Sequence, residues 1–118
     1  MKEEKFKVIQ FIRELILAVD KELNNFPKKE IELKNRIRTA SYDLLELSYE
    51  ANTTIFEEDK KRLIIKIITK TKVIDYLLNM SYDKQLITSK KYIKLGLRLG
   101  DIAKYANGWL KNIIGYKS

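Results

Sequence analysis

The fold of this chain is decided by residues 92–113, which read YIKLGLRLGDIAKYANGWLKNI. Seven residues of this stretch recur at alternating steps of three and four: Tyr92, Leu95, Leu99, Ile102, Ala106, Trp109 and Ile113. Such spacing places side chains on one stripe of an α-helix. Gly96, Ala103 and Leu110 lie seven apart beside that stripe, so part of the face is small. We therefore predict a long amphipathic helix with a close neighbour.

Three earlier stretches have the same helical period, and short joints separate them. Asn24 to Pro27 ends the first stretch, because the residue before a proline is pushed out of the α-region, while Pro27 suits the first turn of a new helix. Thr54 and Glu57 have the spacing of a capping box, and Thr88 is placed to cap the last helix. The predicted helices span about residues 4–24, 27–52, 55–82 and 89–114.

The helix lengths and short joints predict an all-α protein. One proline and four glycines in 118 residues leave few turn-forming positions. We expect a helix content above about 85% and no strand. Four helices with short connections favour an up-down-up-down antiparallel four-helix bundle, formed by residues 1–118 as a single domain.

The residue inventory argues against catalysis. The chain has no Cys and no His, which removes thiol nucleophiles, imidazole acid-base chemistry and Cys/His zinc sites. Glu46 and Glu50 lie one turn apart, but no histidine is present to complete a dimetal site. We expect no enzyme activity, no catalytic residue, no metal, no cofactor and no small-molecule substrate. The charged start and the lack of a long apolar run favour a soluble cytoplasmic protein without membrane contact.

Positive charge is concentrated in the second half of the chain. Residues 1–59 contain 10 Lys and Arg against 13 Asp and Glu, whereas residues 60–118 contain 14 against 3. Two sets of basic residues, here called ladders, repeat at the spacing i, i+4, i+8. The first ladder is Arg62, Lys66 and Lys70, and the second is Lys90, Lys94 and Arg98. Lys91 and Lys104 lie nearby in sequence. The surrounding acids are too few to neutralise these ladders.

If the last two helices form an antiparallel hairpin, the two ladders can merge into one cationic face. Such a face usually binds phosphate, so we predict binding of RNA or DNA with little sequence preference. Neutralising about six phosphates would give a slope of log affinity against log salt of about −4 to −5. Tyr105 is a further candidate, either stacking on a base or packed internally. The alternative for the ladders is a solvated lysine surface without a ligand.

Some apolar and small residues indicate contact with further copies of the chain. Ile65 and Ile68 point well round from the main stripe of their helix, so they are either interface residues or ordinary exposed apolar residues. Gly96 and Gly100 would allow close approach of another helix. Trp109 is expected in the core or at a subunit interface. We predict a homo-oligomer that uses these five residues.

A family resemblance sharpens these expectations. Phe26-Pro27-Lys28, Leu33, Arg36-Ile37, the run from Leu44 to Leu47 and Glu50-Ala51 resemble, in order and spacing, the accessory variability determinant proteins of diversity-generating retroelements. The likeness covers roughly residues 20–112, up to Gly108-Trp109-Leu110-Lys111. A related bundle family, encoded by intervening sequences in bacterial 23S ribosomal RNA genes, shares the Phe-Pro-Lys joint. Its Ser-Ile-Pro-Ser-Asn-Ile-Ala-Glu-Gly signature is absent here.

The resemblance implies a four-helix protomer in a barrel-shaped homopentamer with a basic surface. It implies that the assembly binds the retroelement's reverse transcriptase and its template RNA or complementary DNA, and supports mutagenic copying without catalysis. Arg36 matches a family position, and it either touches nucleic acid or braces the Phe26-Pro27 joint. The competing hypothesis is a stand-alone bundle of the intervening-sequence type, with a structural or interaction role and no nucleic-acid function. A neighbouring reverse transcriptase gene would decide between the two.

Overall fold

The computed structural model describes residues 2–117, with side chains from residue 5 to residue 113. The described residues form four α-helices, which are α1 (Lys2–Leu23), α2 (Ile31–Thr53), α3 (Glu57–Asp83) and α4 (Ser89–Lys117). A short 3-10 turn, η1 (Lys28–Glu30), precedes α2. Helix makes up 89% of the structure, and residues 2–117 contain no strand, which confirms the all-α prediction.

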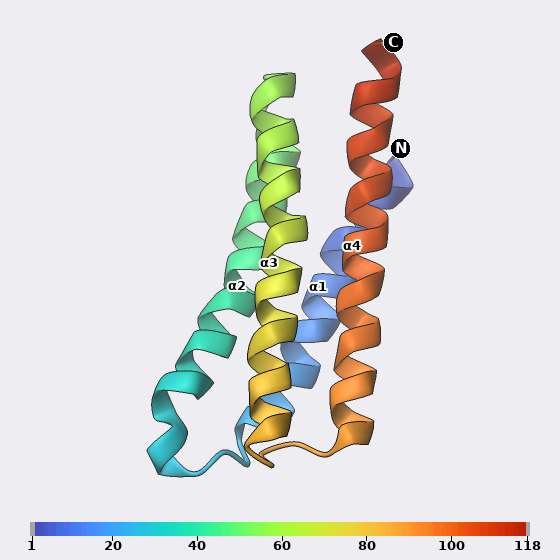
Figure 1. Cartoon of the computed structure of the whole chain (residues 1–118). Coiled ribbons are helices and arrows are strands. Elements are labelled where there is room, and N and C mark those ends of the chain that lie inside the picture. The colour runs from blue at the N-terminus through green and yellow to red at the C-terminus, as the bar shows by residue number, and fades with distance from the viewer. Residues whose placement is uncertain (1, 118) are drawn as a thin grey trace.

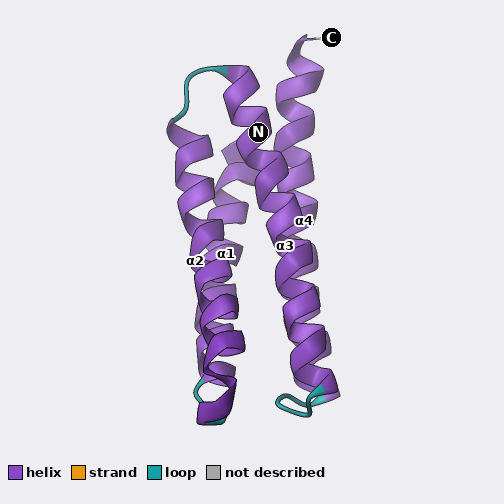
Figure 2. Ribbon diagram, turned by 60° about the vertical axis from the view of Figure 1, so that its left-hand side comes forward, coloured by secondary structure: helices purple, strands orange, loops and turns teal. Residues whose placement is uncertain are grey.

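The helices form the predicted antiparallel bundle (Figures 1 and 2). Each helix packs against its neighbours in the chain, and α1 also packs against α4 to close the bundle. The diagonal pairs, α1 with α3 and α2 with α4, make no close approach among the described residues. The bundle is elongated, with extents of 49 × 23 × 18 Å. The α1/α4 and α2/α3 pairs therefore lie on opposite sides of the molecule.

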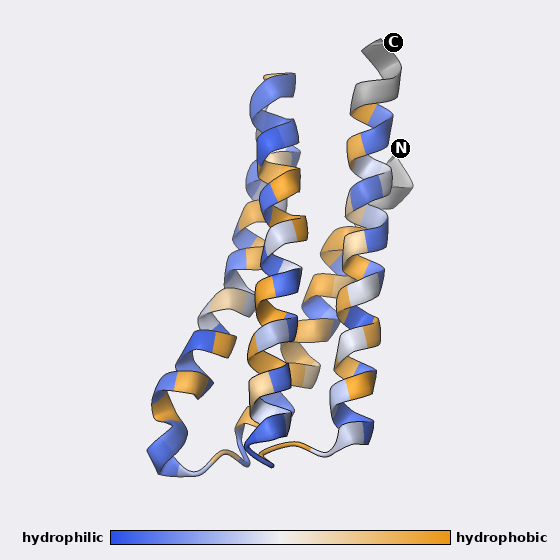
Figure 3. Cartoon of the chain, in the orientation of Figure 1, coloured by the Kyte–Doolittle hydropathy of each residue, from blue (hydrophilic) through white to orange (hydrophobic). Residues whose placement is uncertain are grey.

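The predicted apolar stripes supply the core. The side chains of Val8, Ile12, Leu15, Ile37 and Leu44 are fully buried in the first hairpin. The second hairpin contributes a matching set, which comprises Ile64, Ile67, Ile74, Leu78, Leu95, Leu99, Ile102, Ala106 and Trp109. Apolar and polar segments alternate along every helix (Figure 3), as expected for helices with one buried face.

The joints differ from prediction at two places. Pro27 has φ −65° and ψ 157° and precedes the 3-10 turn, so the α-helix begins at Ile31 rather than at Pro27. The prediction of a capping box at Thr54 was wrong. The Thr54 hydroxyl donates to the Glu50 carbonyl at 2.7 Å, and Phe56 occupies the N-cap of α3 without a side-chain cap. Thr54 is extended directly after α2, so the last carbonyls of α2 are the nearest acceptors.

The α3–α4 joint follows the expected chemistry. The backbone N–H of Lys91 donates to Thr88 Oγ1 at 3.2 Å, which confirms Thr88 as a helix cap. At the preceding helix end, the N–H of Leu86 donates to the Ser81 carbonyl at 2.8 Å, and the N–H of Gln85 to the Tyr82 carbonyl at 2.9 Å. These two bonds form a Schellman motif that ends α3.

Candidate nucleic-acid interface

Two members of each cationic ladder line a groove of the bundle, and the two grooves are different. Lys66 and Lys70 line a groove between α2 and α3, where Asp43 also lies. Lys94 and Arg98 line a groove between α1 and α4. Because these helix pairs are on opposite sides of the bundle, the merged cationic face expected from the sequence does not form.

The ladders are also separated along the bundle axis. Arg62 lies near the start of α3, and Lys90 is the second residue of α4. The two helices are antiparallel, so these residues lie at opposite ends of the hairpin (Figure 1). At 1.5 Å per residue, the distance along the axis is roughly 30 Å. The six residues cannot act as one compact site within a protomer.

Acids from the first half of the chain partly neutralise both ladders. Lys70 Nζ lies 3.4 Å from Asp43 Oδ2, Arg98 Nη1 lies 3.4 Å from Glu14 Oε1, and Lys91 Nζ lies 3.1 Å from Glu22 Oε1. Arg62 pairs with Asp59 one turn earlier on α3. The expectation that the surrounding acids leave the ladders unneutralised was therefore wrong. The acids come from α1, α2 and the first turn of α3.

Four of the predicted nucleic-acid-binding residues have no ion-pair partner among the described side chains. Lys66, Lys90, Lys94 and Lys104 form no ion pair with any described side chain. Lys104 Nζ instead lies 5.7 Å from the centroid of the Tyr105 ring. Tyr105 itself packs against Phe11, with ring centroids 5.4 Å apart, so it occupies a packed position between α4 and α1.

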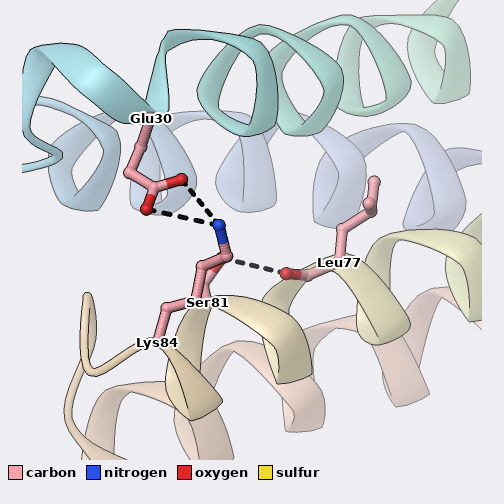
Figure 4. Close-up of polar contacts among 4 residues, drawn as sticks. All are labelled: Glu30, Leu77, Ser81 and Lys84. Atoms are coloured by element: carbon pink, nitrogen blue, oxygen red, sulfur yellow. Dashed lines mark hydrogen bonds and ion pairs between the residues drawn. The ribbon is translucent and has the colours of Figure 1, made fainter.

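Arg36 lies in a third groove, between the start of α2 and the end of α3. This foot groove has a volume of about 850 Å³ and is lined by Leu33, Leu77 and Lys84 among others. Lys84 Nζ donates to both carboxylate oxygens of Glu30, at 2.9 and 3.3 Å (Figure 4). The joint before α2 is thus tied to α3 by Lys84, and Arg36 forms no ion pair with a described side chain.

The five predicted interface residues divide into two groups. Trp109 is only 5% exposed, and Ile68 packs against the core, so both have little surface left for a second copy. Ile65 is half exposed, and Gly100 is exposed with nothing within 4 Å of an added Cβ atom, whereas Gly96 is half-buried and faces Asp75 of α3. Three further exposed apolar residues on α3 and α4 were not predicted from the sequence, namely Tyr76, Ile93 and Leu97. Ile93 and Leu97 are four apart on the polar side of α4, and this was the available signal.

The buried hydroxyl groups are satisfied within their own helices. Ser41 donates to the Ile37 carbonyl at 2.8 Å, and Thr71 donates to the Ile68 carbonyl at 2.6 Å. Ser81 donates to the Leu77 carbonyl at 2.9 Å (Figure 4). Such bonds are common for hydroxyl side chains inside helices. They give these groups a structural role.

Among the described residues, no three acidic side chains gather closely enough to hold a metal ion. None of the described helices has the length and apolarity of a membrane span.

Comparison with known proteins gives no match. No protein-family model, curated protein or solved structure is significantly similar to the chain. The structure itself defines the fold class, the all-α four-helix bundle.

Proposed function

We propose that this protein is a non-catalytic, oligomeric accessory protein that binds nucleic acid and serves the reverse transcriptase of a diversity-generating retroelement. The observation that carries the proposal is the set of lysines without acid partners, which are Lys66, Lys90, Lys94 and Lys104. They stand in a half of the chain with 14 basic and 3 acidic residues. The link to a reverse transcriptase, and to template RNA or complementary DNA, rests on the resemblance.

Phosphate is the ligand that best fits these lysines. An unpaired lysine on a protein of net charge +8 attracts polyanions at long range. Each lysine that neutralises a phosphate releases a condensed counterion, which favours binding at low salt without any base recognition. The proposed binding is therefore electrostatic and tolerant of sequence.

Oligomerisation is the second part of the proposal, and it rests on the outer side of α3 and α4. Ile65 and Tyr76 lie three turns apart on one side of α3, and Ile93 and Leu97 lie one turn apart on α4. All four are at least half exposed. These exposed apolar side chains support a protein interface on the outer side of α3 and α4. Five-fold symmetry comes from the resemblance alone.

A salt titration tests nucleic-acid binding. Four unpaired lysines at about 0.7 to 0.9 counterions each give a slope of log affinity against log salt between about −2.8 and −3.6. The measurement is the anisotropy of a short fluorescent RNA or DNA strand at several salt concentrations. Weak binding that does not change with salt would rule out an electrostatic nucleic-acid site.

The alternative is a stand-alone bundle with a structural or interaction role. It is favoured by the ion pairs of Arg62, Lys70, Lys91 and Arg98, which explain these cations without a ligand. Co-purification with the neighbouring reverse transcriptase, with and without nuclease, separates the two functions. Recovery of the polymerase only without nuclease indicates a nucleic-acid bridge, and recovery in both cases indicates direct contact. Absence of the polymerase in both cases favours the stand-alone bundle.

A further inference from the structure

The groove between α1 and α4 has a larger excess of positive charge than the two grooves between α2 and α3. It has a volume of about 420 Å³, and its lining contains Lys21, Lys91, Lys94 and Arg98 against the carboxylates of Glu14 and Glu22. Four cations thus face two anions. The groove between α2 and α3 contains Lys66 and Lys70 against Asp43 and Glu46, which balance.

The foot groove between α2 and α3 has an intermediate net charge. Its lining contains Lys29, Arg36 and Lys84 against Glu30 and Glu32, a single excess positive charge. Lys84 binds both carboxylate oxygens of Glu30. By charge balance, the α1/α4 groove is the strongest anion site among these three.

Arg98 is incompletely bonded in the α1/α4 groove. Its Nε atom is buried and has no hydrogen-bond partner among the described residues. Its Nη1 atom lies 3.4 Å from Glu14 Oε1, whereas a strong charge-assisted bond is about 2.7–2.9 Å long. An unbonded buried N–H is costly in free energy. The contact with Glu14 therefore leaves the guanidinium poorly satisfied.

A phosphate group would satisfy Arg98 better than Glu14 does. The Arg98 side chain is 36% exposed, so its guanidinium can turn toward the groove opening. A phosphate can accept hydrogen bonds from Nε and an Nη atom at the same time, in the bidentate geometry that arginine favours. Lys94, one turn away and without an acid partner, can bind the same or the adjacent phosphate.

We propose that the α1/α4 groove binds the phosphodiester backbone of nucleic acid, with Arg98 and Lys94 as the main contacts. The proposal rests on the proposed function and locates its binding site. Glu14 and Glu22 act as internal competitors that hold Arg98 and Lys91 until phosphate displaces them. The α2/α3 groove, whose charges are balanced, contributes at most the single unpaired lysine Lys66.

The chain provides a matched pair of variants for the test. The groove variant is Lys94→Gln with Arg98→Gln, and the control is Lys66→Gln with Lys70→Gln. Each variant removes two positive charges four residues apart on one helix. Each also removes one ion-paired cation and one unpaired lysine. The total charge, the helix spacing and the number of lost ion pairs are therefore equal.

The probes are a fluorescent oligouridylate, the matching DNA strand and a DNA duplex, each followed by anisotropy. Losing two phosphate contacts at about 0.7 counterions each should weaken single-strand binding about 25-fold near 0.1 M salt. The salt slope should become less negative by about 1.4. The control variant removes one of the four unpaired lysines, Lys66, so its slope should become less negative by only about 0.7. Glu14→Gln should strengthen binding severalfold, because it removes the carboxylate that competes for Arg98.

The outcomes separate this inference from the proposed function. If the wild-type protein binds none of the three probes, the proposed function fails. If the wild type binds and the control variant is weakened as much as the groove variant, the groove assignment fails while the function stands. If a polyglutamate peptide displaces RNA at equal charge, the groove is a site for acidic protein segments and the phosphodiester assignment fails. Circular dichroism confirms that each variant is folded, and the Glu14→Gln gain cannot arise from unfolding.

Discussion

Gln85 occupies a backbone conformation that favours glycine. Its φ is 63°, and it is the only non-glycine residue with positive φ in the described chain. It lies directly after the C-cap of α3, at the position of a Schellman motif that most often contains glycine. A side chain in the left-handed region costs roughly 1–2 kcal/mol. The turn is therefore held by the surrounding structure rather than by the preference of Gln85.

We predict that Gln85→Gly stabilises the protein. Relief of the left-handed strain exceeds the added entropy of glycine in the unfolded chain, so the free energy of unfolding should rise by about 0.5–1 kcal/mol. Urea unfolding followed by circular dichroism measures this change. Gln85→Ala is the control, since it keeps the Cβ atom and should leave stability nearly unchanged. A less stable glycine variant would show that the Gln85 side chain itself supports the turn.

At the scale of the element, α4 contains two glycines that its own bundle does not require. A Cβ atom at Gly96 would lie 3.8 Å from Asp75 Oδ1, which is ordinary van der Waals distance, and at Gly100 nothing lies within 4 Å. Each glycine inside a helix costs about 1 kcal/mol relative to alanine. Close approach by another helix would explain both residues.

We therefore predict opposite effects of Gly96→Ala and Gly100→Ala on the protomer and on the assembly. In dilute protein, each change should raise the free energy of unfolding by up to about 1 kcal/mol. At higher concentration, the added methyl groups should weaken self-association. Urea unfolding and light scattering measure the two effects. More stable variants with unchanged self-association would move the interface away from these glycines.

At the scale of the whole molecule, exposed apolar residues occur on all four helices, for example Leu17 on α1 and Leu97 on α4. Ile65 lies on the outer side of α3 and is 50% exposed, and Tyr49 lies on α2 with 49% exposed. The glycines of α4 favour the α3/α4 side as the interface. A charge buried there without a partner would cost several kcal/mol.

Ile65→Asp should dissociate the assembly, and Tyr49→Asp should not. Multi-angle light scattering at micromolar concentration should give a multiple of 14.0 kDa for the wild type and the Tyr49 variant. The Ile65 variant should elute at the protomer mass. A wild-type protein of protomer mass at these concentrations would exclude the proposed oligomer.

The sequence alone was sufficient for the helices and the core. The step of three and four in residues such as Leu95, Leu99 and Ile102 is local information, because the helix repeat follows from backbone geometry. Short joints then leave few topologies, so the antiparallel bundle follows. For Trp109, the sequence predicted a position either in the core or at a subunit interface. Its place on the apolar stripe shows that its side chain is covered, but it does not show which neighbour covers it.

The tertiary structure decided which charges are free and where they lie. Glu14 is separated from Arg98 by 84 positions, and Asp43 from Lys70 by 27, so neither pair has a local sequence signal. Which helix neighbours which also placed the two ladders on opposite sides of the bundle. Thr54 shows the same limit on a smaller scale, because its hydroxyl could donate to a carbonyl at the end of α2 or accept from an amide at the start of α3, and the path of the joint selected the carbonyl of Glu50. Electrostatic partners depend on distances across the fold, whereas helix formation depends on neighbours along the chain.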